Sequence, residues 1–303
     1  MKPKTYWKQY DFLYKNHSKK SMYKTLKRIA KKLGQPYKKK DPRGNKLKFS
    51  SIEYASFTCL QKIFRHRYRD MELEATLYLP EKADHSTFAR NYAKIPEHYI
   101  ESLIILFVQK EFCYWIADST GISTKIRVER IRQGTRNKEK LRDKFHTILG
   151  YDPPTSATFV LSAKATDNAC SDSKAAIDAV KNRESTAYFF GDSAYHTYEL
   201  QEVLKENGFF AVIKPTKIKT RKPMSSRAKA EEKFSKGLYR GIRGVGETIY
   251  GGATNAGLIL TYAKKEHTRR LDTLIIALRH NLFASLRFVL VICATNSANN
   301  KHL

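Results

Sequence analysis

Two aspartates share a local setting in the sequence. Asp118 stands in "FCYWIADSTG" and Asp192 in "YFFGDSAY", so each follows an apolar run and precedes small polar residues. Two carboxylates held side by side repel each other and need a cation between them. Mg2+ favours carboxylate oxygens, and two such ions about 3.5–4 Å apart can activate an attacking oxygen and stabilise a leaving one in phosphodiester chemistry. If their strands are neighbours, Asp118 and Asp192 predict a metal site.

Each aspartate is expected at the tip of a β-strand. Asp118 ends the β-rich run "FCYWIADST", and Asp192 follows the apolar run closed by Phe189 and Phe190. Thr197 can then cap a helix with one apolar face, which would end before a second apolar run, "FFAVIKP". The segment 188–215 therefore predicts the order strand, turn, helix, strand.

The rest of the chain supplies further elements of the same kind. Residues 51–108 show helical spacing, the runs 144–152 and 157–167 are strand-like, and 171–183 predicts a helix with a serine cap. Strands without a helix between them form hairpins, whereas strands joined by a helix lie parallel. The predicted fold class is therefore α/β, with a mixed sheet of antiparallel hairpins and parallel crossovers, flanked by helices.

The charge points to a polyanionic partner. The net charge is +28 with a pI near 9.9, while 41% hydrophobic residues allow a substantial core. Nucleic acid is the first candidate for the partner and an anionic membrane surface the second. Lysine and arginine number 17 in residues 1–50, against Asp11 and Asp41 alone. The helix predicted at 22–34 would lie along phosphates; the alternative is a solvated basic tail.

A membrane location is disfavoured. The most apolar stretch, 271–296, is interrupted by charged and polar residues, including Arg279 and Arg287, whereas a span needs about 20 mostly apolar residues. We expect a buried helix there, followed by a strand-like run, "RFVLVICAT". No apolar segment follows the N-terminal lysines as in a signal peptide, and the four cysteines lie far apart. These features predict a cytoplasmic protein, and a nucleic-acid partner would associate it with the nucleoid.

Three segments of the chain carry a resemblance to a known family. "IADSTGISTK" resembles the first-aspartate strand of the DDE transposases of bacterial and archaeal insertion sequences, within the ribonuclease H-like superfamily. "FFGDSAYHTYELQEVLKENGFFAVIKP" resembles their second-aspartate segment, and "YRGIRGVGETIYG" their C-terminal signature, where tyrosine and arginine precede a glutamate. The resemblance implies that Asp118, Asp192 and Glu247 are the catalytic and metal-binding triad.

The same resemblance implies a function and its partners. It implies a transposase that cuts and transfers DNA strands at terminal inverted repeats with two Mg2+ or Mn2+ ions, and a homodimer that pairs the element ends. The expected organisation is a basic, aromatic DNA-binding extension at 1–50, a helical region at 51–110, a ribonuclease H-like domain at 111–295 and a tail at 296–303. Arg243 would contact a phosphate of the cut strand or support Glu247. Other DNA contacts are expected from Arg240, Lys125, Arg127 and Lys214.

Several features leave alternatives open. Tyr239 stands four residues before Arg243 rather than three, and glycines at 241, 244, 246 and 251 imply either a weak helix or close packing. Rivals for the third acid are Glu231, Glu232 and Glu266. The chain could instead be a catalytically inactive DNA-binding descendant, or a cellular ribonuclease H-like nuclease. His146 is expected to be a strand residue, and His196, which follows the second aspartate, to be satisfied locally rather than to bind metal.

Overall fold

The computed structural model describes residues 18–38, 47–108, 110–124, 129–131, 138–140, 143–216 and 234–299. They form two compact units. The first contains the described residues up to Phe107 together with those from Asn281 onward, and the second is Val108–His280.

The first unit is helical, as the spacing in 51–108 predicts. Its elements are α2 (Lys19–Leu33), α3 (Ser51–Ile63), α4 (Tyr68–Glu74), η1 (Ala75–Leu77), α5 (His85–Tyr92), α6 (Glu97–Leu106) and the last part of α12 (Glu266–Asn299). Ser50 and Glu53 form a capping box that starts α3. Gly34 ends α2 with a φ of +92°, a conformation that residues with a Cβ rarely adopt.

Helix α2 has two faces of different character. Its apolar side chains, among them Leu26 and Ile29, are buried, and α2 packs against α3 and α6. The side opposite is basic and exposed, with Lys20, Lys24, Arg28, Lys31 and Lys32. The predicted helix with a lysine face is therefore present, and its other face belongs to the core of the unit.

The second unit is built on a mixed sheet. Its elements are β1 (Tyr114–Thr124), β2 (Glu129–Ile131), β3 (Lys138–Lys140), β4 (Asp143–Asp152), β5 (Ala157–Asp167), α7 (Asp172–Val180), β6 (Tyr188–Gly191), η2 (Ser193–Tyr195), α8 (Tyr198–Glu206), β7 (Phe210–Ile213), α10 (Lys236–Arg243), η3 (Gly244–Gly246), α11 (Glu247–Asn255), β8 (Leu260–Thr261) and the start of α12. The strand order is β5-β4-β1-β6-β7, and β8 also pairs with β1.

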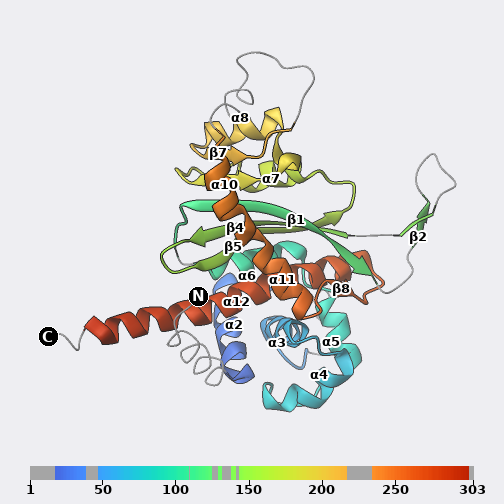
Figure 1. Cartoon of the computed structure of the whole chain (residues 1–303). Coiled ribbons are helices and arrows are strands. Elements are labelled where there is room, and N and C mark those ends of the chain that lie inside the picture. The colour runs from blue at the N-terminus through green and yellow to red at the C-terminus, as the bar shows by residue number, and fades with distance from the viewer. Residues whose placement is uncertain are drawn as a thin grey trace. The chain divides into compact units, whose positions relative to one another are not determined.

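The directions of the strands confirm the predicted α/β class. β4 is antiparallel to both β1 and β5, whereas β6 is parallel to β1 and β7 is parallel to β6. Successive residues of a strand point to opposite faces, so Asp118 and Ser119 lie on different sides of β1. The orange segment from α10 to α11 crosses the strands in Figure 1.

The prediction that Asp118 ends its strand is wrong. β1 runs on to Thr124, and β4 pairs with it as far as the partners Ile122 and Asp143. The antiparallel ladder satisfies the backbone groups beyond Asp118, so the small polar residues there stay extended instead of turning. Asp118 therefore lies within β1, at the point where the pairing with β6 has already stopped at Ile116.

The prediction that "RFVLVICAT" is strand-like is also wrong. Helix α12 continues through it to Asn299. A short apolar run cannot be assigned to helix or strand by periodicity alone, and adding residues to an existing helix needs no new nucleus. Within the residues that the structure describes, no helix combines the length and the apolarity that a bilayer span requires.

Candidate active site

The register of two parallel strands brings Asp118 and Asp192 to the same region. Ile116 of β1 is the partner of Phe190 of β6. Asp118 stands two residues after Ile116, and Asp192 stands two residues after Phe190. Neighbouring strands lie about 4.8 Å apart, so this register sets Asp118 in β1 beside Asp192 at the end of the neighbouring strand. Asp192 follows β6 directly, and its Oδ1 accepts a hydrogen bond from the backbone N of Ala194 at 2.8 Å.

Glu247 reaches the same region from a third element. It is the first residue of α11, directly after η3. A Cβ built on Gly246 would lie 3.0 Å from Cγ2 of Ile116 and 3.6 Å from Oδ2 of Asp118. A glycine lets η3 approach β1 this closely without a shift of either element, so the close packing implied by the glycines is present at this position.

Arg243 connects Glu247 with Asp118. Its Nη1 donates to Oε1 of Glu247 at 2.5 Å, and its Nη2 lies 3.3 Å from both carboxylate oxygens of Asp118. The side chain of Asp118 is 10% exposed, whereas that of Glu247 is 69% exposed. The guanidinium thus joins a buried acid to an exposed one.

The charge of Asp118 is set by these neighbours. Burial raises the pKa of its carboxyl, while Arg243 and the hydrogen bond from the Ser119 backbone N oppose the rise. The negative charges of Asp192 and Glu247 raise the pKa of Asp118 further. Because such an effect needs proximity, three carboxylates from three elements share one electrostatic environment.

Tyrosine hydroxyls surround this group of acids. The hydroxyl of Tyr250 lies 2.8 Å from Oγ1 of Thr147, and Thr147 is the strand partner of Asp118. Burial raises the pKa of Tyr250, Tyr195 and Tyr239, so these phenols are neutral near pH 7 and can donate hydrogen bonds. Sequence reasoning gave Tyr250 no role, although its position three residues after Glu247 places it within one helical turn of that acid.

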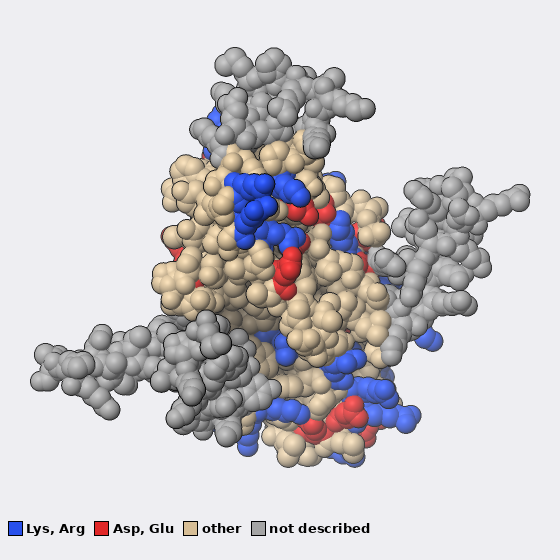
Figure 2. Space-filling view, in the orientation of Figure 1, with Lys and Arg blue, Asp and Glu red and all other residues tan. Residues whose placement is uncertain are grey.

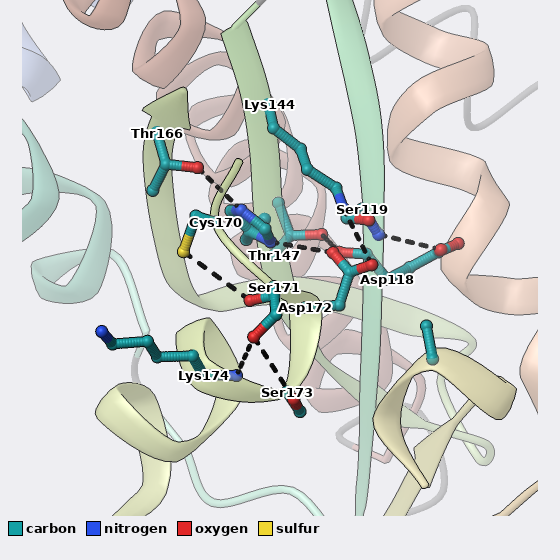
Figure 3. A network of polar contacts seen from close by, with 12 residues as sticks. Asp118, Ser119, Lys144, Thr147, Thr166, Cys170, Ser171, Asp172, Ser173 and Lys174 are labelled. Atoms are coloured by element: carbon teal, nitrogen blue, oxygen red, sulfur yellow. Dashed lines mark hydrogen bonds and ion pairs between the residues drawn. The ribbon is translucent and has the colours of Figure 1, made fainter. Parts of the chain in front are cut away.

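A fourth acid, Asp172, supports β1 from the face opposite Asp118. Asp172 accepts a hydrogen bond from Nζ of Lys144 at 2.9 Å, lies 3.1 Å from Nδ1 of His146, and accepts a third bond from the Ser119 side chain. Figure 3 shows Asp172 pointing toward Ser119 and Lys144. Burial opposes ionisation, but these bonds hold the pKa of Asp172 well below its usual range. Asp172 therefore anchors the residue whose backbone N holds Asp118.

The two histidines make local contacts. Nε2 of His146 lies 2.9 Å from Oγ1 of Thr166, and Nδ1 of His196 lies 3.1 Å from Oγ1 of Thr216. Both histidines are buried. His146 is a residue of β4, as its predicted strand position requires.

The remaining candidates lie in different places. Arg240 is exposed on α10, and Lys214 is exposed directly after β7. Figure 2 shows basic side chains gathered over α10, with acidic ones beside them. Glu266 begins α12 and pairs with Arg270 at 2.5 Å. Lys125, Arg127, Glu231 and Glu232 lie outside the described residues.

The three acids have the chemistry to bind a hard divalent cation, and the guanidinium of Arg243 already contacts two of them. All three offer carboxylate oxygen, and Asp118 and Glu247 share the positive guanidinium of Arg243. They are not gathered tightly. Among the described residues, the ligand atoms that all lie within 4.8 Å of one another belong to Glu72, Asp84 and His85 in the first unit, where Nδ1 of His85 already lies 3.0 Å from Glu72.

Comparison with known proteins places the chain in a family. Residues 113–291, more than half of the chain, match the family described as the transposase DDE domain. No curated protein matches the chain. Among solved structures, the piggyBac transposase in a synaptic complex with hairpin DNA is similar at 9% identity and a TM-score of 0.44, over 91% of this chain and 73% of that chain. At that identity and score the likeness assigns no residue of this chain.

Proposed function

Since the chain belongs to the family of the transposase DDE domain, we propose that Asp118, Asp192 and Glu247 form its metal-binding triad and that it cuts and joins DNA at the ends of an insertion element. The observation that carries this proposal is geometric: the register of β1 and β6 sets Asp118 beside Asp192, and the guanidinium of Arg243 contacts both Asp118 and Glu247. A group of carboxylates suits a hard divalent cation, whose charge offsets the repulsion between them.

The residues divide the work among three elements. Asp118 is held in β1 by its strand pairing with Thr147 and by the backbone N of Ser119. Asp192 is fixed by the turn that follows β6, and Glu247 by the start of α11. Mg2+ or Mn2+, as a pair of ions, would activate the attacking water or 3′-hydroxyl and stabilise the leaving 3′-oxygen. The neutral phenol of Tyr239 can donate to phosphate oxygens without adding negative charge, whereas the hydroxyl of Tyr250 is engaged by Thr147.

The DNA would be held by basic side chains. Arg240, Lys214 and the exposed basic face of α2 offer positive charge to phosphates, as do Lys125 and Arg127 in the sequence. In this proposal residues 1–50 bind DNA, 51–110 form a helical region, 111–295 form the catalytic domain and 296–303 form a tail. A homodimer would pair the two terminal inverted repeats and the target DNA.

One experiment separates this function from its alternatives. The full chain is incubated with DNA that carries the flanking ends of its element and with Mn2+, and the products are examined for both nicks and joined strands. Joined products that disappear in Asp118→Asn support the transposase. Nicks without joining would instead identify a nuclease, and binding without any product an inactive descendant.

A further inference from the structure

A cation already stands between two acids of the candidate active site. Nη2 of Arg243 lies 3.3 Å from both oxygens of Asp118, and Nη1 lies 2.5 Å from Oε1 of Glu247. These contacts engage three of the four carboxylate oxygens that Asp118 and Glu247 can offer to a metal. A guanidinium and a divalent ion carry charges of the same sign, so they compete for these oxygens at close range.

We infer that Arg243 is an exchangeable counter-ion, which holds Asp118 and Glu247 together before metal binds and is released from them when it does. The inference rests on the proposed function, because it takes these acids as metal ligands. It also accounts for the separation of Asp118 from Glu247, since a bridging guanidinium keeps these two acids further apart than an ion bound by both.

The elements on the two sides of this bridge are held unequally. Helix α10, which carries Arg243, has no buried residue, and additional atoms at Gly241 and Gly244 would meet nothing within 4 Å. Helix α11, which Glu247 begins, is anchored by the buried Ile249 and by Gly246 against β1. Release of the ion pair can therefore move Arg243 while Glu247 keeps its place.

A released Arg243 needs another anion, and DNA supplies one. The planar guanidinium binds a phosphate with two parallel hydrogen bonds, which a lysine cannot do. Arg240 lies three residues earlier on the same helix and is exposed, so both side chains can follow one phosphate backbone. Because coupling between two ligands is reciprocal, DNA that captures Arg243 should tighten metal binding, and metal should tighten DNA binding.

The test measures Mn2+ affinity by calorimetry, without DNA, in the full chain. Arg243→Gln removes the competing cation, and we expect it to bind Mn2+ about tenfold more tightly than wild type, the value of one charge-assisted hydrogen bond. Arg240→Gln is the matched control, because it removes the same charge one turn away without touching the acids, and it should stay within about twofold of wild type. Arg243→Lys keeps the charge but loses the fork, so its affinity should fall between wild type and Arg243→Gln.

The outcomes distinguish this inference from the proposed function. If Asp118→Asn binds Mn2+ as tightly as wild type, the metal site itself is wrong. If Asp118→Asn loses Mn2+ but Arg243→Gln binds it no more tightly than wild type, the metal site stands and the exchange is refuted. An equal gain in Arg243→Gln and Arg240→Gln would reduce the effect to general repulsion and also refute it. A short DNA duplex should tighten Mn2+ binding in wild type and have a smaller effect in Arg243→Gln, after correction for Mn2+ bound by the duplex alone.

Discussion

Gly246 lies directly against Asp118: a Cβ on Gly246 would stand 3.6 Å from Oδ2 of Asp118 and 3.0 Å from Cγ2 of Ile116. The contact joins η3 to β1 and sets where α11 begins. A methyl group at position 246 would therefore shift Glu247 relative to Asp118 by a few tenths of an ångström. Other glycines nearby, such as Gly251, have nothing within 4 Å of an added Cβ.

Gly246→Ala should disturb this contact. The added methyl must move η3 away from β1 by a few tenths of an ångström. We therefore expect a loss of roughly 1 kcal/mol in the free energy of unfolding, and slower cleavage. Gly251→Ala, in the open part of α11, should instead gain about 0.5–1 kcal/mol from helix propensity. Urea denaturation of both variants tests the difference. Equal effects in the two variants would mean that the close approach has no energetic weight.

Glu247→Gln should abolish cleavage while DNA binding persists. The amide keeps the shape of the side chain but loses the charge that holds metal. Glu266→Gln is a closely matched control, because Glu266 also begins a helix, is 61% exposed and pairs with an arginine four residues away. It should cleave like wild type. Loss of cleavage in Glu266→Gln but not in Glu247→Gln would identify Glu266 as the third metal ligand instead of Glu247.

Asp118→Asn should stabilise the protein at neutral pH when metal is removed by EDTA. Burial raises the pKa of Asp118 in the folded state, so the folded protein binds this proton more tightly than the unfolded chain. Wild type therefore loses stability as the pH rises through the raised pKa, and the variant does not. The gain in Tm should shrink below about pH 4, near the unfolded pKa, where the wild-type carboxyl is protonated in both states. Added Mn2+ should raise the Tm of wild type only.

Asp172→Asn should show the opposite sign. Its hydrogen bonds lower the pKa of Asp172 in the folded state, so the stability they contribute is present above the unfolded pKa and is lost as the pH falls through the folded one. We expect a loss of about 2 kcal/mol at pH 7, which diminishes below about pH 4. Asp178→Asn, on the same helix with a half-exposed pair to Lys164, should cost no more than about 0.5 kcal/mol. Thermal unfolding across pH compares them.

The exposed basic face of α2 should contribute to DNA affinity. Deletion of α2 would remove part of a core, so the test replaces Lys20, Lys24, Arg28 and Lys31 with glutamine. The slope of log K against log salt should flatten by about 0.9 for each of these residues that neutralises a phosphate on duplex DNA. Glutamine at Lys38, which lies beyond the helix and is also exposed, is the single-site comparison. An unchanged slope in the fourfold variant would identify the face as merely solvated.

Local chemistry made much of the fold predictable. Ser171 and Thr197 cap the helices that the sequence assigns to them, and the apolar runs at 144–152 and 157–167 are strands. These features depend on neighbouring residues alone, because a cap or an alternating strand is decided within a few positions. The order of elements, and hence the α/β class, follows from them.

The contacts between segments far apart in the sequence were decided by the tertiary structure. The sequence could not show that β4 would extend β1 beyond Asp118, or that Asp172 would reach Ser119 from the opposite face. The spacing of Arg243 and Glu247 predicted that they share a face, but not that the same guanidinium would contact Asp118, 125 residues earlier in the chain. Such contacts arise from packing between elements, where the register of strands and the close approach allowed by Gly246 fix which charges meet.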